Sequence, residues 1–118
     1  MDVACGGRTT AEPLAVQRDF GAAALELVDA IPEGSVLTYG DVAALLGSRA
    51  ARAVGTALAR SGGRHPWWRV VRSGGHPPRG LESDARAHYE AENTPLTSAP
   101  TECGYRVDYA VARWKGIS

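Results

Sequence analysis

The sequence has few cysteines and no long apolar stretch. Its 118 residues include two cysteines, Cys5 and Cys103, which are too few for a disulfide framework. No apolar run approaches the length that spans a membrane, and the N-terminus lacks the basic-then-apolar pattern of a signal peptide. These absences argue against secreted disulfide scaffolds and membrane proteins. We therefore expect no membrane partner and a cytoplasmic location, with association to the nucleoid if the protein is bacterial.

Signatures of metal and cofactor binding are also missing. The three histidines, His65, His76 and His88, do not stand at metal-ligand spacings with the cysteines. Neither a phosphate-binding loop nor a dinucleotide-binding fingerprint occurs. Cys103 has no neighbouring histidine or motif that would indicate a reactive thiol, so we expect a buried or unreactive thiol there. We therefore expect neither a metal nor a cofactor.

Acidic residues are absent from the middle of the chain. Residues 42–81 contain seven arginines and no Asp or Glu, although the whole chain has 13 basic and 13 acidic residues. This segment carries a charge of +7. The rest of the chain carries −7, because it contains the other six basic residues and all thirteen acidic ones. Twelve of the thirteen basic residues are Arg, whose guanidinium suits bidentate phosphate contacts and stacking. A neutral protein with such a local field can bind nucleic acid.

The length and the apolar pattern predict one small domain. Residues 1–14 are small and polar and are expected to be disordered, which leaves 15–118 as a single domain. Apolar residues recur at helical spacing from Val16 to Ile31, which predicts a helix with one buried stripe.

A helix-turn-helix is predicted in the following segment. Thr38 can cap its first helix, with Asp41 as the capping-box partner. The buried face of that helix is expected to consist of Val42, Leu45 and Leu46. A Gly47-Ser48 turn follows, and Ser48 can cap a third helix that runs to about Arg60.

The third helix has two contrasting faces. At about 100° per residue, one group of side chains falls within roughly an 80° arc. This group consists of Arg49, Arg52, Thr56 and Arg60. The opposite side carries Ala51, Val54 and Leu58. One face is therefore expected to pack against the core and the other to present positive charge.

The elements after the third helix are short. Trp67–Val71 is expected to be extended, and a short helix is expected over Asp84–Glu92. Residues 93–103 have a loop-like composition, and Tyr105–Tyr109 is predicted to be a strand of a wing hairpin. Trp114 is expected to anchor the tail. The predicted fold class is mainly α with a small β wing, a winged helix-turn-helix.

Three short segments of the chain are read together as one sequence pattern. They read Leu37-Thr38-Tyr39-Gly40, Ala50-Ala51-Arg52-Ala53-Val54-Gly55 and Pro66-Trp67-Trp68-Arg69-Val70. Together they resemble the C-terminal, DNA-binding domain of O6-alkylguanine-DNA alkyltransferases, over roughly residues 17 to 80. In those enzymes the third segment reads Pro-Cys-His-Arg-Val, and its Cys accepts the alkyl group. Here Trp67 stands at the Cys position, as in the alkyltransferase-like proteins, which bind alkylated guanine without repairing it.

The resemblance implies DNA-binding roles for residues of the helix-turn-helix. Arg52 matches the family's arginine finger, which would fill the gap left by a flipped-out nucleotide. Tyr39 matches the tyrosine that rotates the phosphate of that nucleotide. Ser48, Arg49 and Arg60 would add contacts along the same face. The alternative is that the arginines are solvated surface residues and that Tyr39 is half-buried at a helix start.

A lesion pocket is expected around Trp67 and Arg79. Indole is a far poorer nucleophile than a thiolate, so Trp67 cannot accept an alkyl group and would instead stack on the damaged base or line its pocket. Trp68 departs from the family, which usually has a His there that helps to activate the Cys. Arg69 is expected to brace the loop through backbone carbonyls. Arg79, on a Pro-rich loop, would place its cation against the alkylated base. For both tryptophans the alternative is a core role.

These features predict a non-enzymatic sensor of O6-alkylguanine. It would bind the lesion in double-stranded DNA by nucleotide flipping, without a catalytic residue, and direct it to nucleotide excision repair proteins. By resemblance it would be a monomer. Two alternatives stay open. One is an active methylated-DNA–protein cysteine methyltransferase with a displaced acceptor, Cys5 or Cys103. The other is a sequence-specific winged-helix regulator, although the third helix lacks the Asn and Gln that read bases.

Overall fold

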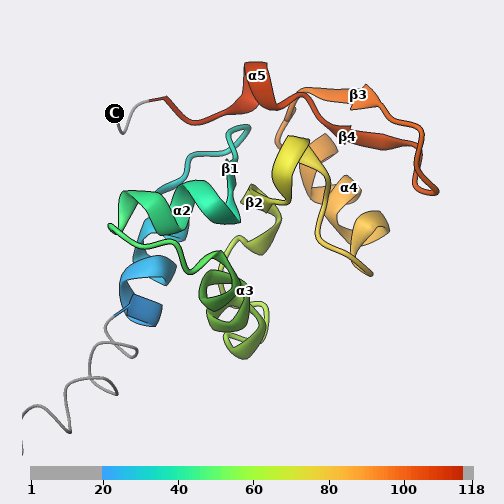
Figure 1. Cartoon of the computed structure of the whole chain (residues 1–118). Coiled ribbons are helices and arrows are strands. Elements are labelled where there is room, and N and C mark those ends of the chain that lie inside the picture. Colours follow the sequence, from blue (N-terminus) through green and yellow to red (C-terminus); the bar gives the residue numbers. More distant parts are fainter. Residues whose placement is uncertain (1–19, 116–118) are drawn as a thin grey trace, which may run out of the picture.

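The computed structural model describes residues 20–115 as a set of short helices with two small sheets (Figure 1). The disorder expected for residues 1–14 lies outside this range. The elements are a first helix (residues 20–30), β1 (Leu37–Thr38), α2 (Tyr39–Leu45), α3 (Ala51–Arg60), η1 (Trp67–Arg69), β2 (Val70–Val71), η2 (Ser73–Gly75), α4 (Glu82–Ala91), β3 (Leu96–Ser98), β4 (Tyr105–Val107) and α5 (Tyr109–Ala112). The fold is mainly α with a small β wing, as predicted. Within residues 20–115, no helix has the length and apolar character needed to cross a membrane.

Helices α2 and α3 form the predicted helix-turn-helix. Thr38 caps α2, because its Oγ1 accepts a hydrogen bond from the Asp41 amide at 2.9 Å. The buried residues of α2 are Val42 and Ala43, whereas Leu45 is 44% exposed, so the predicted burial of Leu45 was wrong. The direction midway between Val42 and Ala43 lies about 110° from Leu45 at about 100° per residue, which turns Leu45 away from the core.

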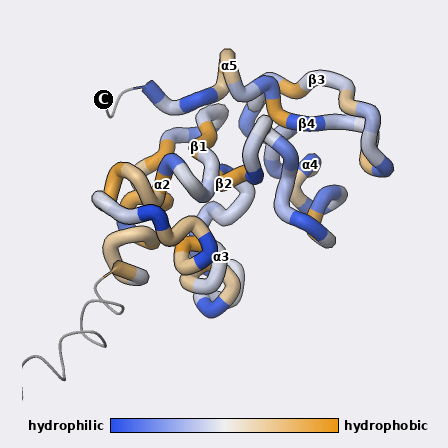
Figure 2. Tube along the Cα trace, in the orientation of Figure 1, coloured by the Kyte–Doolittle hydropathy of each residue, from blue (hydrophilic) through white to orange (hydrophobic). Residues whose placement is uncertain are grey.

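Two clusters of buried side chains form the core. The first joins the first helix to α2 and α3 and consists of Ala24, Val28, Ile31, Leu37, Val42, Ala43, Val54, Leu58 and Val70. The second joins α4 to the wing and α5 and consists of Val36, Val71, Ala85, Tyr89, Tyr105, Val107 and Ala112. Trp67 packs against both clusters. In Figure 2, apolar residues gather around the first helix and α2, whereas α4 is mostly hydrophilic.

The parallel pair of β1 and β2 connects the two clusters. Leu37 lies opposite Val70, and Thr38 lies opposite Val71. Successive side chains of a strand point to opposite faces. Val70 therefore enters the first cluster and Val71 the second.

The predicted extended conformation of Trp67–Val71 was wrong for its first three residues. They form the 3₁₀ turn η1, in which the Arg69 amide donates to the Pro66 carbonyl at 3.0 Å. Only Val70 and Val71 pair as a strand. The turn directs two neighbouring tryptophan side chains toward α4 instead of to opposite faces of a strand.

The wing is an antiparallel hairpin of β3 and β4, with Leu96 opposite Val107 and Ser98 opposite Tyr105. The strand predicted over Tyr105–Tyr109 is confirmed for its first three residues, after which α5 begins. The loop predicted for residues 93–103 was wrong at β3. A three-residue strand shows too little alternation to be recognised before its partner is known.

The tail is anchored at Trp114, as predicted. The Trp114 amide donates to the Val36 carbonyl, and the Val36 amide donates to the Ala112 carbonyl, both at 3.0 Å. The Trp114 side chain packs against the first core cluster. The Tyr109 hydroxyl also donates to the Asp41 carboxylate, which ties α5 to α2.

Candidate nucleic-acid interface

Helix α3 has one basic face and one buried face. Its exposed side carries Arg52, Thr56 and Arg60, and its buried side carries Val54 and Leu58. Arg49 is exposed as well, but it lies in the turn before the helix. The remaining residues of α3 are Ala and Gly, so a ligand could approach its backbone closely. The two-faced helix predicted from the sequence is confirmed.

Ser48 lies in the turn between α2 and α3 and does not cap α3. Its Oγ accepts a hydrogen bond from the Ala50 amide at 2.9 Å, and Ala50 itself holds the N-cap position. The expectation that Ser48 caps the third helix was therefore wrong. Its hydroxyl closes a local turn instead, which delays the helix start to Ala51. A DNA contact from Ser48 stays a prediction.

Tyr39 is the first residue of α2, and its ring lies against α3. A methyl group at Gly55 would stand 3.8 Å from Tyr39 Cε1, which is an ordinary contact distance, so the ring lies directly beside this residue of α3. Burial raises the pKa of Tyr39, and the positive charge of Arg72 offsets part of that rise. The hydroxyl therefore stays protonated at neutral pH and could donate to a phosphate oxygen.

Trp67 and Trp68 form an aromatic group with His88 of α4. The Trp68 and His88 rings are stacked, with centroids 3.6 Å apart and planes 6° apart. Trp67 meets both rings edge-on, at 5.6 Å from Trp68 and 5.7 Å from His88. One face of Trp68 is therefore already occupied within the protein. All three side chains are partly exposed.

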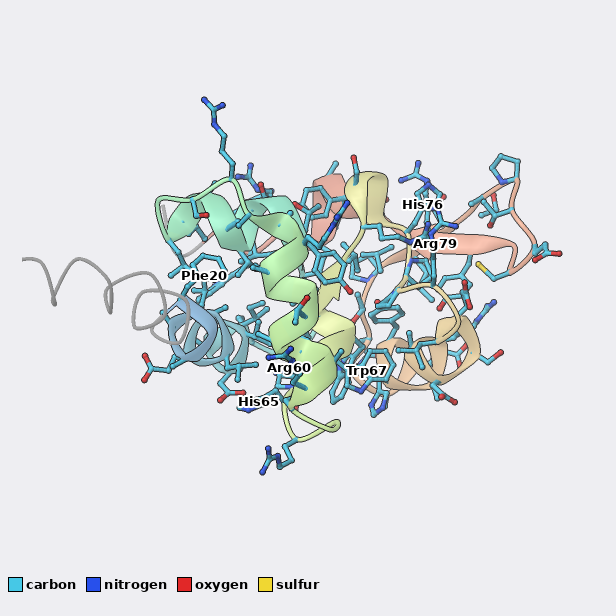
Figure 3. The ribbon with its side chains drawn as sticks, turned by 60° about the horizontal axis from the view of Figure 1, so that its bottom comes forward. Phe20, Arg60, His65, Trp67, His76 and Arg79 are labelled. Atoms are coloured by element: carbon cyan, nitrogen blue, oxygen red, sulfur yellow. The ribbon has the colours of Figure 1, made fainter. Side chains whose placement is uncertain are left out.

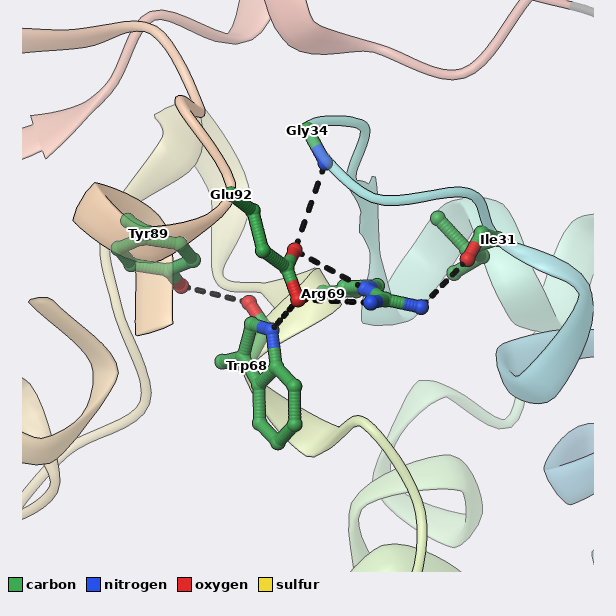
Figure 4. Close-up of polar contacts among 6 residues, drawn as sticks. All are labelled: Ile31, Gly34, Trp68, Arg69, Tyr89 and Glu92. Carbon is green, nitrogen blue, oxygen red and sulfur yellow. Dashed lines mark hydrogen bonds and ion pairs between the residues drawn. The ribbon is translucent and has the colours of Figure 1, made fainter. Parts of the chain in front are cut away.

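The Glu92 carboxylate holds three separate segments together (Figure 4). It accepts hydrogen bonds from Trp68 Nε1 at 2.9 Å, from Arg69 Nε at 3.1 Å and Nη2 at 2.6 Å, and from the Gly34 amide at 3.4 Å. Arg69 Nη1 also donates to the Ile31 carbonyl at 2.8 Å. Arg69 does brace its surroundings through a carbonyl, and the carboxylate adds an ion pair that the sequence did not predict.

The surroundings of Glu92 favour its ionised form. Burial would raise the pKa of Glu92, but hydrogen bonds from Arg69, Trp68 and Gly34 together outweigh that effect and lower it. The side chains of Arg69 and Glu92 are only 13% and 9% exposed. The pair is thus a nearly buried ionic contact with its hydrogen bonds satisfied, which fixes η1 to α4 and to the loop after the first helix.

Arg79 lies on an exposed part of the loop between η2 and α4. Pro77 and Pro78, which precede it in the chain, are buried, and Arg72 Nε donates to the Pro77 carbonyl at 2.8 Å. In Figure 3, Arg79 lies apart from Trp67. The structure therefore brings Trp67, Trp68 and Arg69 together but does not bring Arg79 to them.

Sequence reasoning missed two residues of this region, His88 and Glu92. His88 lies in the last turn of α4 and Glu92 is the C-cap of that helix, and their spacing of four residues is the signal that could have pointed to them. Nothing local indicated that these two residues would meet the two tryptophans. Within residues 20–115, no group of three or more His, Cys, Asp or Glu side chains is arranged to hold a metal ion.

A comparison with sequence families places the chain. The family described as 6-O-methylguanine DNA methyltransferase, DNA binding domain, matches residues 19–94, which is more than half of the 118-residue chain. The chain belongs to this family. The matched range begins at the first helix and includes the helix-turn-helix, both tryptophans of η1 and Glu92.

The chain is also similar to curated proteins and to solved structures. Proteins named DNA base-flipping protein, from Escherichia coli (strain K12) and Shigella flexneri, are each 61% identical over 49 residues. That match covers 39% of this chain and only 38% of each relative. A crystal structure of S. pombe Atl1 in complex with damaged DNA containing O6-carboxymethylguanine is 28% identical, with a TM-score of 0.71. A crystal structure of S. pombe ATL in complex with DNA is 29% identical, with the same TM-score. Both likenesses cover 83% of this chain and 96% of the other.

Proposed function

We propose that this chain is a non-enzymatic sensor that binds O6-alkylguanine in duplex DNA by nucleotide flipping. The observation that carries the proposal is the family match over residues 19–94, combined with the exposed arginine face of α3. The solved Atl1 structure holds damaged DNA, and its fold covers most of this chain. In this proposal the lesion is then directed to nucleotide excision repair.

Arg52 fills the gap in the duplex in this proposal. A flipped-out nucleotide leaves its partner base without a stacking neighbour, and a guanidinium on a helix of small residues can enter that space. Arg52 is exposed on the basic face, with Ala51 and Ala53 beside it. Tyr39 supports the same role from the flank of α3, where its protonated hydroxyl can meet the phosphate of the rotated nucleotide.

In this proposal Trp67 stacks on the damaged base and does not react with it. An indole has no thiolate to attack an alkyl carbon, so the lesion is held and not repaired. Stacking of one base on an aromatic side chain contributes about 1–3 kcal/mol, and flipping a poorly paired base costs a few kcal/mol. The stacking energy is thus similar to the cost of flipping a poorly paired base. A well-paired guanine costs more to flip, so damaged guanine is favoured.

The decisive experiment measures binding to matched duplexes with guanine or O6-methylguanine at one position. We expect clear preference for the lesion, which Arg52→Ala abolishes. Trp67→Ala should weaken lesion binding roughly 5- to 150-fold, the equivalent of about 1–3 kcal/mol of stacking. Arg86→Ala is the matched control, because it also removes one arginine but from the exposed side of α4, and it should keep the preference. Equal affinity of the wild-type protein for both duplexes would contradict the proposal.

Mass spectrometry after mixing the protein with the O6-methylguanine duplex tests the absence of repair. No methyl adduct is expected on the protein. Cys103 is half-buried, and its Sγ donates to the Tyr105 carbonyl at 3.3 Å, which is no arrangement for activating a thiol. A methyl group found on either Cys5 or Cys103 would establish a transferase and overturn this part of the proposal.

A further inference from the structure

A hollow of about 1060 Å³ runs along one flank of α3. We call it the α3 hollow. Its apolar lining comes from the first helix, the turn between α2 and α3, and α3 itself, and includes Phe20, Leu46 and Ala53. Arg60 and Arg64 also belong to the lining. Among the described residues that line it there is no Asp or Glu, so the charged groups facing the α3 hollow are positive.

The α3 hollow and the two tryptophans lie on opposite flanks of α3. Tyr39 meets α3 at Gly55. Gly21 of the first helix meets α3 at Ala57, because a methyl group added to Gly21 would stand 3.9 Å from Ala57 Cβ. Figure 3 shows α3 running between Phe20 on one side and Trp67 on the other. The arginine face of α3 is the ridge between these two flanks.

A duplex that receives the arginine face of α3 in one of its grooves must place one strand on each flank. Either groove is bounded on both sides by sugar–phosphate backbone, so an inserted helix has one strand beside each flank. In the proposed function, the damaged strand passes the flank of Tyr39 and Trp67. The undamaged strand then passes the flank that contains the α3 hollow.

We propose that the α3 hollow seats the sugar–phosphate backbone of the undamaged strand, with Arg60 and Arg64 pairing with its phosphates. This inference rests on the proposed function and assigns a strand to a flank. The Nε of Arg64 donates to the Ser61 carbonyl at 2.8 Å, which holds this side chain beside the hollow. The apolar lining suits the carbon faces of deoxyribose, and Arg60 joins the hollow to the arginine face of α3. An acidic backbone fits this charge better than a second copy of a neutral protein would.

Neutral phosphate analogues tell the two strands apart. Methylphosphonates are placed one at a time in either strand of an O6-methylguanine duplex, and affinity is measured for the wild-type protein and the Arg60→Gln, Arg64→Gln double variant. Neutral positions in the undamaged strand should weaken wild-type binding but have little effect on the double variant. Loss of two phosphate contacts should also reduce the slope of log K against log salt by about 1.8, or 2 × 0.9. The Arg86→Gln control should leave this slope unchanged.

A second variant tests the hollow without touching an arginine. Ala53→Glu places a carboxylate in the lining and should lower affinity for damaged and undamaged duplexes by the same factor, with the preference for the lesion kept. Thermal unfolding establishes that the variant is folded. If Ala53→Glu leaves affinity unchanged, the backbone does not occupy the α3 hollow.

The outcomes separate the two proposals. A wild-type protein that prefers the lesion, but is weakened only by neutral phosphates in the damaged strand, would retain the proposed function and overturn the strand assignment. A DNA-free dimer in analytical ultracentrifugation that Ala53→Glu dissociates would assign the hollow to a second copy and also overturn it. A wild-type protein without lesion preference would overturn the proposed function itself.

Discussion

Replacing Glu92 with Gln should remove the contact that holds η1 against the rest of the protein. The carboxylate accepts hydrogen bonds from Trp68, from two nitrogens of Arg69 and from Gly34. An amide has one acceptor oxygen and no charge, so it cannot satisfy all of these donors. The Arg69 guanidinium would be left nearly buried without a balancing charge, and the Ile31 carbonyl and the amide oxygen would be its remaining acceptors among the groups in Figure 4.

The size of the effect follows from the burial of the pair. Removing one partner of a buried ion pair costs about 3–5 kcal/mol. The side chains of Glu92 and Arg69 keep 9% and 13% exposure, and the amide keeps one acceptor. We therefore expect a loss of stability at the lower limit of this range. A loss of about 3 kcal/mol is a large part of the 5–15 kcal/mol that stabilises a typical domain. For a domain of this size it should lower Tm by more than about 10 °C.

Urea unfolding followed by circular dichroism, repeated from pH 7 to pH 3, measures this contribution. The hydrogen bonds lower the pKa of folded Glu92 from its ordinary value of 4.5. Its contribution to the free energy of unfolding is therefore complete at neutral pH and is lost as the pH falls from 4.5 through the folded pKa. The Gln variant has no group that titrates here. The difference between the two proteins should thus shrink below pH 4.5.

Glu90→Gln is the matched control on the same helix. Glu90 is 62% exposed and pairs with Arg86 at 3.0 Å, four residues away. Such a surface pair contributes under about 0.5 kcal/mol, so this variant should unfold almost like the wild type. If both variants had the same stability at pH 7, or if the Glu92→Gln deficit were equal at pH 7 and pH 3, the reasoning would fail.

Three further predictions follow from particular positions. Gly75→Ala should lower the Tm by more than Gly62→Ala does in thermal unfolding. Both glycines have positive φ, but only at Gly75 would the added methyl group clash, because it would stand 2.2 Å from a carbonyl oxygen of β4. Trp67→Cys should show no alkyl transfer by mass spectrometry, because the indole of Trp68 has no basic nitrogen to take the thiol proton. Burial raises the pKa of Tyr105 to about 12 from 10.0, so the free energy of unfolding should fall between these pH values, and less steeply in Tyr105→Phe.

Local patterns in the sequence predicted the parts of the fold that neighbouring residues decide. The cap of Thr38 on Asp41 and the two faces of α3 depend on residues within a turn or two of each other. Their physical causes, capping and helical periodicity, act along a short stretch of chain. The same reasoning was wrong for Leu45, Ser48 and the strand β3, because their places depend on what packs beside them.

By itself the sequence determined the basic segment, the helix-turn-helix and the presence of an indole at position 67, since charge, spacing and side-chain chemistry are local properties. Only the tertiary structure decided that Glu92 joins Trp68, 24 residues away, and Gly34, 58 residues away. It also decided that Arg79 lies apart from Trp67 and that a hollow flanks α3. A buried carboxylate must find its donors wherever the packed chain brings them, and no spacing along the sequence specifies that meeting.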